Sequence, residues 1–158
     1  MVLAYENRWA ESDEEFSAAL KLDPNNADAW AYRSDMSYLS GRVTEGLDQI
    51  QRAFRLNPRP ANWYYWILGQ AQYAARQYES AVVTLRNEDT YRTGSRRILA
   101  ASLAQLGRLE EARQEAEMFM VSNPHFTISH WASTQPFRDE ATRAHFIDGY
   151  LKAGLPER

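Results

Sequence analysis

The chain has 158 residues, 44% of them hydrophobic and 25% charged, which is typical of one globular domain and excludes a disordered or collagen-like protein. Its net charge of −3 gives no basic field for nucleic acid, and the absence of cysteine excludes disulfides and thiolate chemistry. No apolar run approaches the ~20 residues of a membrane span, and the N-terminus lacks a secretory signal. We therefore expect a cytoplasmic protein with no nucleic-acid or membrane partner.

The helices predicted along the chain are marked out by turns and prolines. Proline cannot continue a helix, so each proline that follows an apolar segment is a predicted helix end. Three turn-to-proline pairs have identical spacing: Asn7 and Pro24, Gly41 and Pro58, and Gly107 and Pro124. A fourth turn, at residues 76–78, has no following proline. This regular spacing predicts a repeat of helix pairs.

Residues within this spacing match the pattern Trp-x2-Leu-Gly-x2-Tyr followed by Ala-x3-Phe-x2-Ala-x4-Pro. The matches are Trp30, Ser34, Ser37, Gly46, Ile50, Ala53 and Pro58, then Tyr65, Leu68, Gly69, Gln72, Ala81 and Leu85, then Arg96, Leu99, Ala100, Leu103, Ala112, Ala116, Phe119 and Pro124. Over residues 7–126 the chain resembles the tetratricopeptide repeat (TPR) proteins. The resemblance implies an all-α fold, a TPR-like right-handed α-solenoid of antiparallel helix pairs that binds a protein or peptide.

The repeats divide one TPR-like domain, residues 1–158, into five parts. These are a partial repeat at 1–26, repeats at 27–61, 62–92 and 93–126, and a C-terminal cap at 127–158. The third repeat is short, so its second helix should be shortened, with an irregularity following it. Too few residues precede Asn7 to form a complete first helix. We therefore expect an exposed face there and homodimer formation through residues 1–20, around Trp9 and Phe16.

The segment 139–153 is the last predicted helix, with Asp139 as its N-cap and Gly154 as its stop. Phe146, Ile147 and Tyr150 share one face, which should pack on the fourth repeat and cap it.

This tail also carries a narrower resemblance. Pro136-Phe137-x-Asp139-x3-Arg143-x2-Phe146-x2-Gly149, followed by Ala153-Gly154-Leu155-Pro156, is similar to the ending of a bacterial family. In that family TPR segments follow an adenylate/guanylate cyclase domain or a winged-helix regulator. The resemblance implies the regulatory C-terminal part of a bacterial signalling protein.

No catalytic, cofactor-binding or metal-binding residue is predicted. Phosphate-binding and nucleophile motifs are absent, and His125, His130 and His145 are not spaced as zinc ligands, so surface or capping roles are expected for them. We expect a non-catalytic interaction module that needs no cofactor. Two alternatives are a regulatory fragment that acts directly in a nucleotide cyclase reaction and a purely structural homo-oligomerisation module.

The TPR resemblance also implies where a partner binds, because the first helix of each repeat lines a concave groove. The groove positions are Asp28, Asp35, Tyr38, Trp63, Trp66, Gln70, Tyr73, Arg97 and Gln105. Trp, Tyr and Arg are frequent binding anchors, but Trp63 and Trp66 are equally consistent with packing on neighbouring helices. A basic cluster of Arg92, Arg96 and Arg97 is a candidate phosphate or carboxylate contact, with pairing to Glu88 and Asp89 as the alternative.

Overall fold

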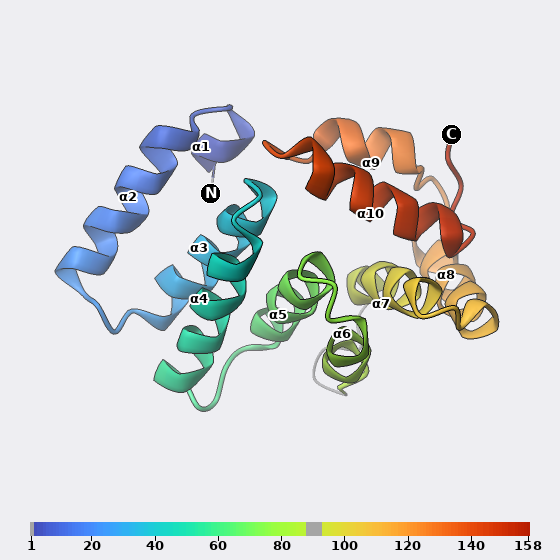
Figure 1. The fold of residues 1–158 in the computed structure, drawn as a ribbon, viewed down its shortest axis with the longest axis horizontal. Coiled ribbons are helices and arrows are strands. Elements are labelled where there is room, and N and C mark those ends of the chain that lie inside the picture. The colour runs from blue at the N-terminus through green and yellow to red at the C-terminus, as the bar shows by residue number, and fades with distance from the viewer. Residues whose placement is uncertain (1, 88–92) are drawn as a thin grey trace.

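The computed structural model describes residues 2–87 and 93–158, the side chain of residue 93 excepted. Within these ranges it contains ten α-helices and no β-strand, so the all-α prediction is confirmed (Figure 1). The helices are α1 (Val2–Tyr5), α2 (Trp9–Leu22), α3 (Ala27–Leu39), α4 (Val43–Leu56), α5 (Asn62–Ala74), α6 (Tyr78–Leu85), α7 (Thr93–Gln105), α8 (Leu109–Ser122), α9 (Ile128–Thr134) and α10 (Glu140–Lys152).

Three antiparallel pairs, α3 with α4, α5 with α6 and α7 with α8, form the body of the molecule. Small residues allow the two helices of a pair to approach closely. A Cβ atom added at Gly46 would lie 3.0 Å from the carbonyl oxygen of Ser34 and 3.2 Å from the backbone nitrogen of Tyr38. At Gly69 an added Cβ would collide with the side chain of Leu85. The small residues of the repeat pattern are therefore required by packing.

One turn geometry recurs before each second helix. The turn residue has a left-handed backbone, with φ of 63° at Asn7, 87° at Gly41, 60° at Arg76 and 75° at Gly107. The next N–H then bonds a carbonyl of the preceding helix: Arg8 to Leu3 at 2.8 Å, and Arg42 to Ser37, Gln77 to Gln72 and Arg108 to Leu103 at 2.9 Å each. Since α1 ends in the same way as α3, α5 and α7, it corresponds to the last turn of a first helix.

The second helices differ in length as the sequence predicts. α2, α4 and α8 have 14 residues each, whereas α6 has 8, which confirms the shortened helix of the third repeat. The irregularity expected after it falls on residues 88–92, which lie outside the described residues.

The C-terminal segment closes back on the body. The carboxylate of Asp139 accepts the backbone N–H of Thr142 at 2.7 Å, and Gly154 has φ of +85°, so both predicted ends of α10 are confirmed. Pro156 and Glu157 accept the backbone N–H groups of Ile128 and Ser129 at 2.9 and 3.0 Å, which binds the tail to α9. None of the helices in the described ranges has the length and apolarity that crossing a bilayer requires.

Candidate functional site

The last helix lies across the first helices of three repeats. α10 packs on α7, as expected of a closing helix, and continues over α5 and α3 (Figure 1). The segment that precedes α10 is hydrogen-bonded to the end of α3, where the backbone N–H of Arg138 donates to the carbonyl of Leu39 at 3.0 Å. We call the side formed by α3, α5 and α7, on which α10 lies, the inner face. Part of the predicted groove is thus occupied by the chain itself.

Two predicted groove tyrosines are buried under α10. Tyr38 stacks on Phe146 with ring centroids 6.0 Å apart, and Tyr73 stacks on His145 at 4.6 Å. The hydroxyl of Tyr73 also donates to the carbonyl of His145 at 3.0 Å. Both tyrosines are at most 2% exposed, so they form core rather than a free binding surface.

Gly149 brings α10 close to the inner face. A Cβ atom at this position would collide with the hydroxyl of Tyr73 and lie 3.1 Å from the Cβ of Ala101. Any side chain would therefore lift α10 from α5 and α7.

Arg97, another predicted groove residue, is also turned toward the C-terminal segment. Its Nε donates to the hydroxyl of Tyr150 at 3.0 Å. Its guanidinium carbon lies 5.3 to 5.8 Å from the ring centroids of Phe119, Phe126, Trp131 and Tyr150. Gln105 likewise donates to Asp148 of α10 at 2.9 Å. The cation–π contacts hold Arg97 in place and the Gln105 bond adds a polar contact with α10.

Two further groove positions, Asp28 and Trp63, lie at the beginnings of α3 and α5. Asp28 is exposed and accepts a hydrogen bond from the hydroxyl of Tyr64. The half-buried ring of Trp63 stacks on Tyr32, with centroids 4.5 Å apart and planes 14° apart. These contacts join α3 to α5 and leave part of both aromatic rings accessible.

Trp66 and Gln70 each hold a polar atom that lacks a partner. The indole Nε1 of Trp66 and the amide Nε2 of Gln70 are buried, and neither has a hydrogen-bond acceptor in the described structure. Trp66, Gln70 and Tyr73 are spaced at i, i+4 and i+7, so they share one face of α5. A buried N–H without an acceptor costs ~1–3 kcal/mol, so an acceptor supplied by a ligand would be stabilising.

The candidate anion cluster is not assembled as one site among the described residues. Arg96 turns toward α8 and bonds the carboxylate of Glu115 at 2.8 Å, whereas Arg97 turns toward α10. Arg92, Glu88 and Asp89 lie outside the described residues. The structure therefore describes neither the complete arginine cluster nor its alternative pairing with Glu88 and Asp89.

The histidines do not gather either. His125 and His130 are exposed, as expected. The expectation of a surface role for His145 is wrong: its side chain is buried against Tyr73, and its Nε2 is hydrogen-bonded to the hydroxyl of Tyr78 at 2.9 Å. Over the described ranges, no group of three His, Asp or Glu side chains is placed to hold a metal ion.

Two solved structures share this arrangement of helices. MamA superposes with a TM-score of 0.65 at 18% identity, covering 94% of this chain and 88% of MamA. YrrB, a TPR protein with an unusual peptide-binding site, superposes with a TM-score of 0.63 at 20% identity, covering 96% of this chain and 79% of YrrB. The fold is that of a TPR solenoid. No protein-family model matches the sequence, and no curated protein matches it.

Asp35 and His145 are buried ionisable groups on the inner face of the TPR solenoid. Burial raises the pKa of Asp35 to about 6, opposed by the hydrogen bond that it accepts from Tyr38 at 2.7 Å. Burial, together with the nearby positive charge of Arg76, lowers the pKa of His145 to about 4. In an unfolded chain these groups titrate near ~3.9 and ~6.5.

These two shifts predict opposite effects of pH on stability. The contribution of Asp35 to the free energy of unfolding is lost as pH rises from ~4 to ~6, and the contribution of His145 is lost as pH falls from ~6.5 to ~4.

Asn at position 35 keeps an acceptor for Tyr38 without titrating. The Asp35→Asn variant should therefore be more stable than the unaltered protein at pH 6.5, with the gain fading by pH 4.5 at up to ~1.4 kcal/mol per pH unit. Urea unfolding at both pH values measures this, and parallel stability curves would contradict it.

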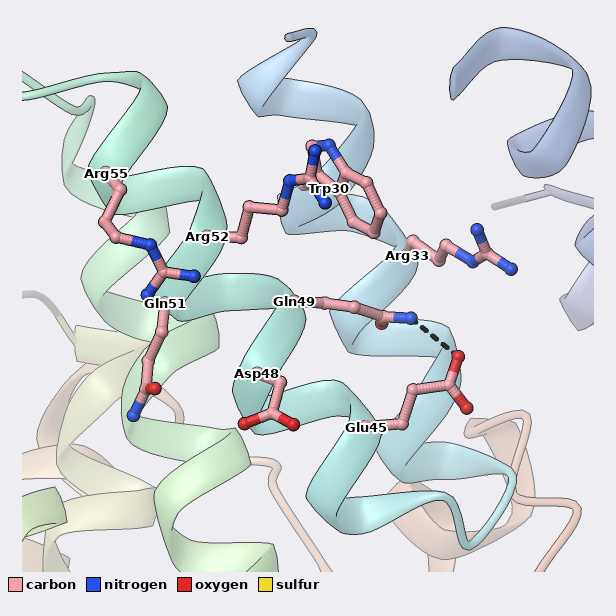
Figure 2. A pocket seen from close by; sticks show the side chains of 8 residues that line it. All are labelled: Trp30, Arg33, Glu45, Asp48, Gln49, Gln51, Arg52 and Arg55. Atoms are coloured by element: carbon pink, nitrogen blue, oxygen red, sulfur yellow. Dashed lines mark hydrogen bonds between the residues drawn. The ribbon is translucent and has the colours of Figure 1, made fainter. Parts of the chain in front are cut away.

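A separate pocket of about 540 Å³ lies on α3 and α4 (Figure 2). Arg52 stacks on the ring of Trp30 at 4.2 Å, and Gln49 donates to Glu45 at 2.8 Å. Arg33 and Arg55 add positive charge, but Glu45 and Asp48 line the same pocket. Because the charges are mixed, this pocket favours no single class of ligand.

Proposed function

We propose that this chain is a non-catalytic TPR module that binds a protein or peptide segment beside α10, on α3 and α5. The observation that carries the proposal is the pair of buried donors, Nε1 of Trp66 and Nε2 of Gln70, that lack acceptors. The carbonyl groups of a bound peptide would supply those acceptors once the two side chains turn toward it. Trp63, stacked on Tyr32, provides an adjacent half-buried aromatic surface of the kind found at binding hot spots.

The proposal predicts that one substitution raises stability and weakens binding. Gln70→Leu removes a buried amide nitrogen that lacks an acceptor, so the free energy of unfolding should rise by about 1 kcal/mol. The same change removes a donor to the peptide, so affinity should fall about 10-fold, equivalent to ~1.4 kcal/mol. The probe is a peptide selected on the unaltered protein from a random 12-residue display library, with affinity measured by calorimetry and stability by urea unfolding.

Gln72→Leu is the matched control. Gln72 lies on the same helix and its Oε1 is also buried without a partner, but it faces α6, in a pocket shared with Ser80 and Thr84. This variant should alter stability without altering peptide affinity. If Gln70→Leu and Gln72→Leu bind the selected peptide equally well, or if no peptide is enriched, the proposed site is wrong.

A place in a bacterial, cytoplasmic signalling protein is a further part of the proposal, and the resemblance of residues 136–156 is its support. The residues of that pattern also have packing roles, since Asp139 caps α10 and Gly149 lets it approach α5. These residues therefore have a structural role in closing this solenoid, and the setting rests on the resemblance alone. A gene whose reading frame joins this segment to a cyclase or winged-helix domain would support the signalling role, and its absence would count against it.

A further inference from the structure

The peptide site proposed on α3 and α5 has a carboxylate at its edge with one oxygen free. Asp28 lies in the first turn of α3, and its Oδ1 accepts a hydrogen bond from the hydroxyl of Tyr64. Its other carboxylate oxygen has no hydrogen bond or ion pair in the described structure. Because Tyr64 belongs to α5, this bond holds the carboxylate at the junction of α3 and α5.

Two aromatic rings with accessible surface lie next to this carboxylate. Tyr32 follows Asp28 by one turn of α3, is 37% exposed and stacks on the half-buried ring of Trp63. Trp63 in turn precedes Trp66 by one turn of α5, so the rings lead from the carboxylate to the donors that lack acceptors. Apolar surface beside a carboxylate suits a side chain with a long aliphatic stem and a positively charged end.

The uncompensated charge on these two helices is negative. α5 has no charged residue, and the charged inner-face positions of α3 are Asp28 and Asp35. Neither carboxylate has an ion pair in the described part of the chain. The basic residues of α3, α7 and α10 all have partners of their own, and these are Arg33, Arg96, Arg97, Arg143 and Lys152. A bound segment therefore meets free carboxylate charge on α3.

The donors on α5 are spaced for an extended segment. Trp66 and Gln70 are four residues apart, so their positions are separated by ~6 Å along the helix axis. In an extended chain the carbonyls of alternate residues point the same way and repeat every ~6.8 Å. A segment that runs along α5 can therefore offer one carbonyl to each donor. Trp63 precedes Trp66 by ~4.5 Å, so a residue one or two positions further along the segment reaches Trp63 and Asp28.

We propose that the segment bound at this site is extended and carries an arginine or lysine that pairs with Asp28. The aliphatic stem of this residue lies on the rings of Tyr32 and Trp63, and its charge bonds the free carboxylate oxygen. The inference rests on the proposed function, since it names the chemistry of the partner at that same site. It makes Asp28 a specificity-determining residue, whereas Trp66 and Gln70 bind the backbone of any extended segment.

The test uses the peptides selected on the unaltered protein from the random 12-residue library. The enriched sequences should share an arginine or lysine at a fixed position. Replacing that residue by norleucine, which keeps the aliphatic stem, should weaken binding about 5-fold by calorimetry. The Asp28→Asn protein should bind the original peptide about 5-fold more weakly, although Asn still accepts the Tyr64 hydroxyl. Combining Asp28→Asn with the norleucine peptide should cause no further loss, because the two changes remove the same interaction.

Asp48→Asn is the matched control, because Asp48 is exposed on α4 and lines the separate pocket on α3 and α4. It removes the same charge and should leave affinity within about 2-fold. Enriched peptides without a basic residue, or equal effects of Asp28→Asn and Asp48→Asn, would overturn this inference alone, provided that Gln70→Leu still weakens binding. If no peptide is enriched, or if Gln70→Leu has no effect on affinity, both this inference and the proposed function fail.

Discussion

Replacing Phe146 by alanine should lower the melting temperature by roughly 6 to 20 °C. Phe146 is 1% exposed, and its ring contacts those of Tyr38, Tyr73, Trp131, Phe137 and Tyr150 at centroid distances of 4.8 to 6.3 Å. Truncating a buried phenylalanine costs ~3–5 kcal/mol, and each kcal/mol shifts the melting temperature of a chain of this size by ~2–4 °C. Circular dichroism on heating measures the effect.

Leu151→Ala provides the comparison, because Leu151 lies on the same helix but is 44% exposed. It should change the melting temperature by a few degrees at most. Equal shifts for Phe146→Ala and Leu151→Ala would mean that α10 is not anchored on the inner face through Phe146.

Removing α10 altogether should have a larger effect. A chain that ends at Pro136 would uncover Tyr38, Tyr73 and Ala101, each at most 2% exposed in the intact protein. Exposed apolar surface of this kind binds hydrophobic dyes and promotes association. We expect strong dye fluorescence, aggregation on concentration and a lowered melting temperature. If the shortened chain stays monomeric, dye-silent and equally stable, α10 is dispensable for the fold.

The helix pairs could be predicted from the sequence because their signals are local. Asp139 caps the next turn through its own side chain, Gly154 adopts the positive φ that ends α10, and small residues such as Gly46 recur at fixed spacing. The short α6 also follows from spacing alone. Each of these signals acts within a few residues or within one repeat.

The position of α10 on the inner face could not be predicted in this way, because it depends on contacts between distant segments. Tyr73 and His145 meet only in the folded chain, and the periodicity of α10 gave no reason to bury His145. Gly149 was the one local signal, since a glycine inside a helix often marks a close approach. The sequence could not show that Tyr38, Tyr73, Arg97 and Gln105 contact the chain's own C-terminal segment. Nor could it show that Trp66 and Gln70 have buried donors without acceptors.

The bond between Arg138 and Leu39 has a consequence for how the molecule unfolds. In a simple solenoid each repeat contacts only its neighbours, so the ends can fray while the middle stays folded. Here the C-terminal segment joins α3 to α7, which places a long-range link in parallel with the chain of neighbour contacts. Loss of one repeat then breaks contacts to α10 as well. The second to fourth repeats should therefore unfold together in one cooperative transition, rather than one after another.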